Sequence, residues 1–407
     1  MAVTPRVALK RAFSTLLAHN AAMAFDFRAL AIATAGFSAF VNLYSPQALL
    51  PELSHDFGVG AGQISALMTA TTGAIALTAP FTGALADVLG RKRLITAAAF
   101  AIVVPTLIMT LASSVPQLVL WRFVQGLLLP PIFTVAVAYV GDEWPPAEVP
   151  RIAGLFISGS SVGGFAGRFV TGAVADLFGW RASFAAVALL TLASAIIVTV
   201  ALPRERRFVR SGGLAAAARQ MFAHLGNVRL LAIYAVGFSV LFNFVATFTY
   251  VSFHLAAPPY FFSPTLLGTL FATYLGGSLA VPWVGRAIPL FGRRRFVLGV
   301  IAIWIVGLLM LLAPPVSIII AGLTLCAVCG MVCQAVSTGY VITTANEGRS
   351  SAAGLYASIY YIGGSAGAFL MGFVWNATGW TGCVAAMVLM QAIMAAIVAA
   401  AWERSRI

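Results

Sequence analysis

The sequence predicts an all-α membrane protein built from two related halves, each with six membrane-spanning helices. Of its 407 residues, 61% are hydrophobic and only 9% are charged, whereas a water-soluble domain has about 25% charged residues. The mean hydropathy is +0.98. In addition, residues 154–180 recur two hundred positions later as residues 354–380. An apolar chain with such a repeat is typical of a duplicated bundle of membrane helices.

The repeat preserves glycines far better than charges. Gly163 and Gly164 recur as Gly363 and Gly364, and the closing Gly-Trp pair is also kept. Three charged residues lack a charged counterpart: Arg168 stands opposite Ala368, Asp176 opposite Asn376 and Arg181 opposite Thr381. Since the scaffold does not need these charges in both copies, we interpret them as functional.

Twelve apolar runs reach the length of about 20 residues that spans a bilayer. We expect helices at residues 30–50, 63–84, 94–112, 117–140, 152–175, 181–202, 230–252, 265–285, 297–313, 317–340, 352–374 and 381–402. The predicted organisation is an N-terminal segment 1–29, a six-helix bundle 30–202, a linker 203–229, a second bundle 230–402 and a tail 403–407. A short amphipathic helix is expected within residues 214–225 of the linker.

The basic residues predict the orientation. Of the 24 Lys and Arg residues, all except Arg122, Arg168 and Arg181 fall on one side of the predicted helices. Positive charge gathers on the cytoplasmic side of membrane proteins, so both termini are expected in the cytoplasm and the protein in the inner membrane. The first helix follows without a small-residue cleavage site, which indicates an uncleaved anchor.

Two matching loops follow the second and eighth predicted helices. Residues 83–93 read Gly-Ala-Leu-Ala-Asp-Val-Leu-Gly-Arg-Lys-Arg, and residues 285–295 keep the glycine spacing and the basic triplet. The first loop resembles the cytoplasmic-loop signature of the major facilitator superfamily at every fixed position. Residues 121–126 are similar to its fourth-helix motif in proton-coupled members, and residues 44–51 and 158–181 resemble the YnfM-like branch of bacterial inner-membrane permeases.

This resemblance implies secondary transport of a small organic molecule by alternating access, driven by protons and directed outward. The loop signature implies a gate made of Gly83, Asp87, Gly90, Arg91 and Arg93. We expect Asp142 and Glu143, at the end of the fourth helix, to pair with its basic residues. Pro289 replaces Asp87 in the second loop, so the gate is expected to be stronger in the N-terminal half.

Glycines repeat every four residues in the fifth helix, at Gly159, Gly163 and Gly167. Small residues at this spacing let membrane helices approach closely. The resemblance implies that the fifth helix packs against the eighth across the two halves, with these glycines in the contact.

Arg122 and Arg168 are the central candidates for substrate binding, because an arginine inside a membrane helix usually marks a transport route or an ion pair. We expect them to form one positive element for an anionic group. The alternative is that Arg168 pairs with Asp176, or Arg122 with Glu52, and that both only brace the fold. The other polar or aromatic candidates along the substrate path are Asn42, Tyr44, Gln47, Gln125, Asn243, Tyr250, Tyr274, Gln334, Tyr360 and Tyr361.

Carboxylates avoid the predicted membrane centre. Glu52 and Asp176, both near the outer side, are the candidates for proton coupling, because neighbouring apolar surface raises a carboxyl pKa. The alternative is that Glu52 merely ends the first helix and that Asp176 caps the turn before Gly179. The first helix carries Asn42, Tyr44 and Gln47 instead of an acid, which argues against a purely cationic substrate.

Two other functions are compatible with this sequence. An importer or facilitator of an organic anion would have a positive cavity without a titratable acid, and a sensor or lipid-moving protein would keep the fold without solute coupling. No enzyme motif, cofactor site or nucleic-acid site is expected. Cys326, Cys329 and Cys333 are expected to pack rather than bind metal. We expect a monomer in the lipid bilayer that moves a small, anionic or amphiphilic substrate together with protons.

Overall fold

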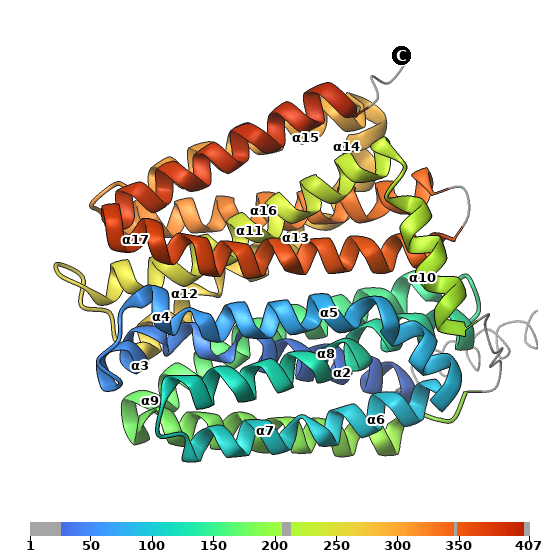
Figure 1. The fold of residues 1–407 in the computed structure, drawn as a ribbon, viewed down its shortest axis with the longest axis horizontal. Helices are drawn as coiled ribbons and strands as arrows, with labels where there is room; N and C mark the ends of the chain where they lie inside the picture. Colours follow the sequence, from blue (N-terminus) through green and yellow to red (C-terminus); the bar gives the residue numbers. More distant parts are fainter. Residues whose placement is uncertain (1–25, 206–212, 346–347, 403–407) are drawn as a thin grey trace, which may run out of the picture.

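The structure, a computed structural model, describes residues 26–205, 213–345 and 348–402. Its long helices lie side by side along the longest axis of the molecule, with the N-terminal elements in one half and the C-terminal elements in the other (Figure 1). Most of the predicted N-terminal segment 1–29 and the predicted tail 403–407 lie outside the described residues.

The N-terminal half begins with an α-helix that is interrupted by a short 3-10 turn. Its elements are α2 (Phe27–Tyr44), η1 (Ser45–Ala48), α3 (Leu50–Asp56), α4 (Ala61–Ile64), α5 (Ala66–Leu89), α6 (Arg91–Ala101), α7 (Val103–Ile108), η2 (Met109–Leu111), α8 (Val115–Glu143) and α9 (Val149–Ala201).

The linker contains α10 (Gly213–His224), which confirms the helix predicted there. The C-terminal half follows with α11 (Val228–Ala256), α12 (Pro264–Leu270), α13 (Thr273–Ala280), η3 (Val281–Trp283), α14 (Val284–Phe291), α15 (Arg293–Met310), α16 (Val316–Thr344) and α17 (Arg349–Ala401).

Helices α9 and α17 each contain two membrane spans. Their backbones leave helical geometry at Gly179 (φ 79°) and Gly379 (φ 66°), a positive φ that glycine adopts without strain. Nine helices among the described residues are long and apolar enough to cross a membrane. Counting α9 and α17 twice and adding α15, which begins with three arginines, gives the twelve predicted spans in two six-helix halves.

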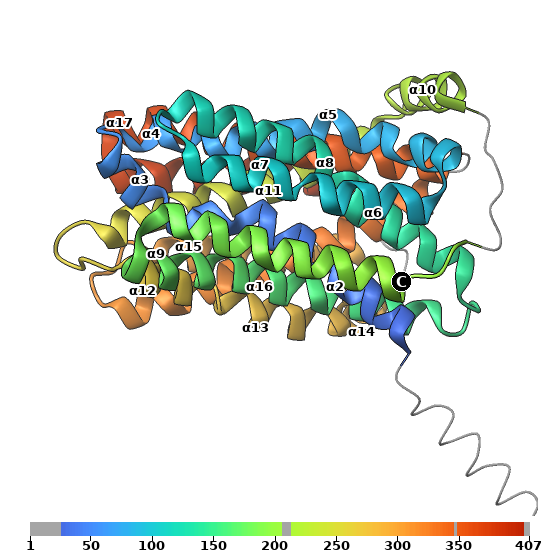
Figure 2. The ribbon, with the colours of Figure 1, turned by 90° about the horizontal axis from the view of Figure 1, so that it is seen from below.

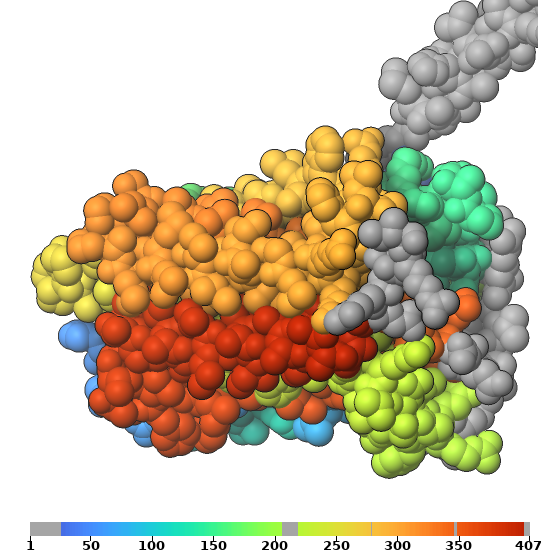
Figure 3. Space-filling model, turned by 90° about the horizontal axis from the view of Figure 1, so that it is seen from above, coloured from blue at the N-terminus to red at the C-terminus, as the bar shows by residue number. Residues whose placement is uncertain are grey.

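The turns with the basic triplets lie at one end of the molecule. Figures 1 and 2 show the α5–α6 turn, α14 and α10 at this end, which we call the basic end. The opposite end, called the far end, carries α3, α4 and α12. Figure 3 shows that the C-terminal elements cover one face of the molecule and that α10 lies against its basic end.

The most extensive contacts between the halves are those of α5 with α17 and of α9 with α12. Along the first pair, Ser358 donates to the carbonyl of Ala76 at 2.7 Å and Ser365 donates to that of Thr69 at 3.0 Å. The expected contact between the fifth and eighth helices is thus confirmed. At that contact a Cβ on Gly172 would lie 2.1 Å from the carbonyl oxygen of Pro264, so the two backbones touch.

The three predicted packing glycines serve a different contact. A Cβ on Gly159 or Gly163 would lie 2.1 or 2.3 Å from a carbonyl oxygen of α2, and one on Gly167 would lie 2.7 Å from another. They hold α9 against α2 within the N-terminal half. The expectation that they face the eighth helix was therefore wrong; the spacing of four predicted a smooth face, but not which neighbour it meets.

Replacing Gly163 by alanine tests this backbone contact. The new Cβ would meet the carbonyl oxygen of Phe37, so the helices must separate, and we expect a loss of about 1–3 kcal/mol of stability. Gly154→Ala is the matched control on the same helix, because no atom lies within 4 Å of its Cβ position. Thermal unfolding in detergent measures both variants, and equal melting temperatures would contradict the contact.

Candidate functional site

A cavity of about 450 Å³ lies between the two halves. Its lining residues belong to the middle of the helices and to their portions nearer the basic end. They are Phe40 and Tyr44 of α2, Phe156, Ile157, Ser160, Ser161 and Gly164 of α9, Phe244 of α11, Tyr274 of α13, Val281 of η3, Met331, Gln334, Ala335, Thr338, Gly339 and Ile342 of α16, and Tyr360 and Tyr361 of α17.

The lining is aromatic and mostly apolar. Of the predicted substrate-binding residues, Tyr44, Tyr274, Gln334, Tyr360 and Tyr361 line the cavity. The described lining contains no Asp, Glu or His. An apolar cavity with a few polar groups of this kind is the usual form of a small-molecule site.

The guanidinium of Arg168 lies behind this lining and is fully buried. Its Nε and Nη2 donate to Oε1 of Gln47 at 2.8 and 2.5 Å. Nη1 donates to the carbonyl of Gly164 at 2.7 Å, and Nη2 also donates to the hydroxyl of Tyr274 at 3.2 Å. Three residues in contact with Arg168, namely Tyr44, Gly164 and Tyr274, line the cavity directly.

All of these partners are neutral. Beyond its hydrogen bonds, Arg168 is surrounded by the rings of Tyr44, Phe271 and Tyr274, whose centroids lie 4.1, 4.1 and 4.5 Å from its central carbon. Among the described residues, Arg168 forms no ion pair. The alternative pairing with Asp176 is therefore wrong. A buried cation without a counter-ion is costly.

Arg122 is buried as well, but it braces the N-terminal half. Nη1 and Nη2 donate to the carbonyls of Asn42 and Leu43, each at 2.7 Å, and Nη1 also donates to Gln125 at 2.6 Å. None of these residues lines the cavity. Arg122 and Arg168 share no hydrogen-bond partner, and that they form one positive element stays a prediction. The alternative that Arg122 pairs with Glu52 is wrong, because no ion pair joins them among the described residues.

The brace is needed because the first span is broken. Pro46, in η1, has no N–H for the carbonyl of Asn42 four residues earlier, and a buried carbonyl without a donor is unfavourable in lipid. Arg122 supplies the shorter of two side-chain hydrogen bonds to this carbonyl, at 2.7 Å, and the hydroxyl of Ser45 donates the other at 3.3 Å. The side chain of Asn42 extends the network, since it donates to Thr191 at 2.8 Å and accepts from Thr106 at 3.2 Å. Gln125 also donates to Thr106.

The remaining candidates lie outside the cavity lining. Tyr250 donates to the carbonyl of Ala368 at 2.8 Å, and its hydroxyl lies 2.9 Å from that of Ser65, so it joins the halves beyond the cavity. Asn243 is buried in α11 and donates to Ser239. Thr249, Phe271 and Phe244 were not predicted, because helix hydropathy alone does not indicate which face of α11 or α12 turns toward Arg168.

The gate residues cluster at the basic end of the N-terminal half. Arg91 forms an ion pair with Asp142, which confirms the predicted partner. Glu205 accepts hydrogen bonds from the backbone N–H groups of Arg91 and Lys92 at 3.0 and 3.2 Å. Gly90 ends α5 with a φ of 89°, which explains a glycine at this turn.

The second loop differs in its contacts. Gly292 keeps the positive φ of 74°, but the guanidinium of Arg293 lies 3.9 Å from the ring centroid of Tyr340. A cation–π contact thus stands where the N-terminal half has an ion pair. Asp87 and its counterpart Pro289 lie in α5 and α14, just before the two turns.

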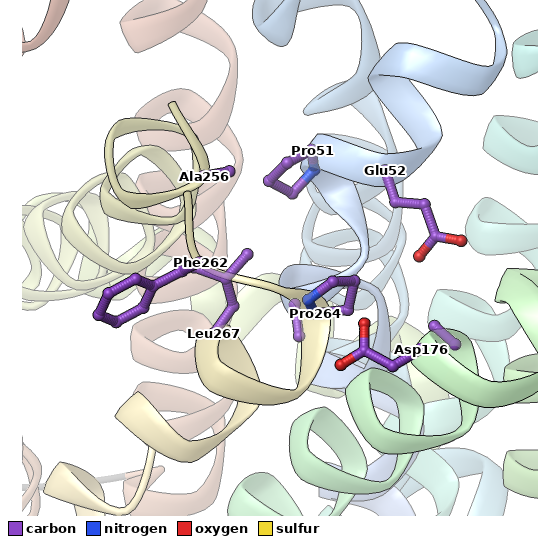
Figure 4. Close-up of a pocket in the computed structure, with 9 residues that line it drawn as sticks. Pro51, Glu52, Asp176, Ala256, Phe262, Pro264 and Leu267 are labelled. Carbon is purple, nitrogen blue, oxygen red and sulfur yellow. The ribbon is translucent and has the colours of Figure 1, made fainter. Parts of the chain in front are cut away.

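A second pocket of about 310 Å³ lies at the far end, between α3, α9 and α12. Figure 4 shows the carboxylates of Glu52 and Asp176 on the same side of it. Asp176 accepts from the hydroxyl of Ser263 at 2.8 Å and from the N–H of Thr265 at 3.0 Å. Asp176 therefore joins the two halves. The alternative role predicted for it, capping the turn before Gly179, does not account for these contacts.

The carboxyl of Glu52 differs from that of Asp176 in its hydrogen bonding. Its Oε2 is buried and has no hydrogen-bond partner among the described residues. Burial raises the pKa of the Glu52 carboxyl, and the nearby carboxylates of Asp56 and Asp176 raise it further. These surroundings favour the protonated acid.

Metal binding has no support in the described part of the chain, where no three His, Cys, Asp or Glu residues come together in a way that suits an ion. The cysteines Cys326, Cys329 and Cys333 are buried in α16 and packed among apolar side chains.

Comparison with known proteins now places the fold. The sequence profile of the Major Facilitator Superfamily matches residues 32–262. The inner membrane transport protein YnfM of Escherichia coli (strain K12) is 31% identical over 368 residues, covering 89% of this chain and 88% of that protein. The chain belongs to the major facilitator superfamily. It is thus a multi-pass membrane protein with the fold of secondary transporters.

Two further matches agree with this placement. An uncharacterized transporter of Buchnera aphidicola subsp. Schizaphis graminum is 29% identical over 88% of this chain and 87% of that protein. The crystal structure of a bacterial homolog of the human lysosomal transporter Spinster, inward-facing and occupied, has a TM-score of 0.76 at 16% identity. That alignment covers 92% of this chain and 96% of the other.

The brace formed by Arg122 gives a prediction. Arg122→Leu, which installs the residue found at the equivalent position 323 of the second half, leaves buried acceptors without donors at a cost of about 1–3 kcal/mol each. We expect a lower melting temperature, while folded protein keeps its affinity for ligand. Arg151→Leu, at an exposed ion pair, is the control. If Arg122→Leu keeps its melting temperature but no longer binds the ligand, Arg122 belongs to the substrate site.

Proposed function

We propose that the protein exports a small amphiphilic organic anion across the inner membrane, in exchange for protons. The observation that carries this proposal is the buried, uncompensated charge of Arg168 beside an aromatic cavity. An anionic group that reaches Arg168 removes the cost of the lone charge, while its apolar body contacts the tyrosine and phenylalanine rings of the lining. A cationic substrate would meet repulsion there.

The basic end is proposed to face the cytoplasm, with both termini on that side, because positive loops stay inside. The cavity extends from the middle of the molecule toward this end. Beyond Arg168, contacts such as Gly172 with Pro264 and Asp176 with Ser263 close the far end. This arrangement supports loading from the cytoplasm and release on the other side by alternating access.

The gate at the basic end is proposed to act mainly through the N-terminal loop. The ion pair of Arg91 with Asp142 and the Glu205 contacts hold α6 against α8 and the start of the linker. These contacts lie within one half, so they fix the loop in a defined position from which it can meet the other half. The second loop relies on Arg293 and Tyr340 instead.

Import or facilitated passage of an organic anion is the second candidate. It is favoured by one observation: the described cavity lining has no carboxyl or imidazole group that takes up a proton. In that case the gradient of the anion itself would drive transport, and Glu52 and Asp176 would only close the far end.

Arg168 variants test the anionic substrate. Arg168→Ala removes the charge, and Arg168→Lys keeps the charge but loses the fork that holds a carboxylate. In proteoliposomes supplied with anionic, neutral and cationic aromatic solutes, we expect wild type to move the anion, and both variants to lower that rate by about tenfold or more. Wild-type affinity for the anion in folded Arg168→Ala protein would refute the proposal.

Glu52 gives a pH prediction. Its pKa is raised in the closed far end, so closure binds the proton; the closed form is most stable at acidic pH and loses stability as the pH rises through the raised pKa. Labelling of an Ala256→Cys probe in the far-end pocket, divided at each pH by its labelling in unfolded protein to remove the effect of thiol ionisation, should therefore increase with pH.

In Glu52→Gln this dependence should be lost and gradient-driven transport should fall. Glu148→Gln, an exposed acid at the basic end, serves as the control. If Glu52→Gln keeps both the pH dependence and the coupled transport, Glu52 does not carry the proton.

A further inference from the structure

Gln47 occupies the place of a carboxylate. It is fully buried in η1, and its Oε1 accepts two hydrogen bonds, from Nε and Nη2 of Arg168. These two donors form one edge of the guanidinium, the edge that binds a carboxylate in a two-pronged pair. A neutral amide oxygen satisfies both donors but brings no negative charge.

The other end of the same side chain reaches the opposite half of the protein. Nε2 of Gln47 donates to Oγ1 of Thr249 in α11 at 3.1 Å. Gln47 therefore links a cation of the N-terminal half to a hydroxyl of the C-terminal half, and the link lies on the closed side of the cavity. Tyr274 adds a second link from Arg168 to the C-terminal half.

We propose that Gln47 is an internal substitute for the substrate carboxylate and that the bound substrate displaces it from Arg168. This inference rests on the proposed transport of an anion. The carboxylate takes Nε and Nη2, the Gln47 amide is released, and its hydrogen bond to Thr249 is lost. Binding of the substrate thereby weakens the closure of the far end, which couples occupancy of the cavity to opening.

The exchange is favourable only for an anion. A carboxylate adds the attraction between two opposite net charges, which is stronger at a buried site than in water, so it outcompetes the neutral amide. An uncharged analogue offers nothing that Gln47 does not already supply. Gln47 is thus a specificity-determining residue: it sets a threshold that excludes neutral molecules of the same shape.

Gly164 connects the cavity lining to the guanidinium of Arg168. It lines the cavity, its carbonyl holds Nη1 of Arg168, and a Cβ at this position would lie 3.5 Å from Nη1. Gly164 has no side chain to fill the space between the cavity and Nη1. Tyr44 and Tyr274, which flank the guanidinium, also line the cavity and offer ring faces to the apolar part of the ligand.

The experiment compares two matched probes, 4-phenylbutyrate and its uncharged amide, 4-phenylbutyramide, by calorimetric titration of the full-length protein in detergent. Wild type should bind the acid and not the amide. Gln47→Ala removes the competitor and should bind the acid about tenfold more tightly. Gln47→Glu puts a permanent carboxylate on Arg168 and should bind the acid at least about tenfold more weakly, with an unchanged or higher melting temperature.

Thr249→Val is the control for the link between the halves. It cuts the hydrogen bond to α11 but leaves Gln47 on Arg168, so far-end labelling should rise while the preference for acid over amide stays. If folded Gln47→Ala binds the acid no better than wild type, or Gln47→Glu binds it as well as wild type, the displacement is refuted.

The outcomes separate this inference from the proposed function. Binding of the acid that depends on Arg168 but is indifferent to Gln47 would leave the anion transporter standing and remove the displacement step. A wild type that binds acid and amide equally, with no effect of Arg168→Ala, would overturn the anionic substrate and the displacement together.

Discussion

A positive charge held among neutral groups dominates the centre of this protein. Arg168 is surrounded by an amide, a carbonyl, a hydroxyl and three aromatic rings, and each contributes partial negative charge at close range. Together they make the buried cation tolerable without neutralising it. Because these partners come from both halves, the same contacts that stabilise the charge also hold the halves together around it.

The two halves share a scaffold but not its polar contents. Asn42 in the first span is matched by Asn243, and Thr191 is matched by Gln391. In the first half Asn42 is fully engaged with Thr191, Thr106 and the Arg122 network. In the second half, among the described residues, Oδ1 of Asn243 and both amide atoms of Gln391 are buried without partners. The broken span and its arginine brace thus belong to the N-terminal half alone, while α11 runs through without a break.

Much of the architecture could be predicted from the sequence because it depends on patterns along one chain segment. Apolar runs and the repeat predicted twelve spans, and the basic loops predicted that Arg91 and Asp142 share an end of the molecule. The partner of a buried side chain could not be predicted in this way, because it depends on how each helix is rotated about its axis. The repeat singled out Arg168, because the uncharged Ala368 stands opposite it, yet nothing in the neighbouring sequence indicated that Gln47 would bind it. The hydrogen bond between Asp176 and Ser263 of the other half could not be predicted for the same reason.

Helix α10 contacts both halves of the protein at the basic end. His224 lies 3.2 Å from the carbonyl of Gly348, and Ser351 donates to Gln220 at 2.9 Å, so the linker helix is docked on the first turn of α17. It also contacts α5 across the boundary between the halves. Any rocking at this end must shear the helix against one of its two neighbours. The position of α10 therefore changes with the relative position of the two halves. A fluorophore attached at the exposed Phe222 position would report that change without entering the substrate route.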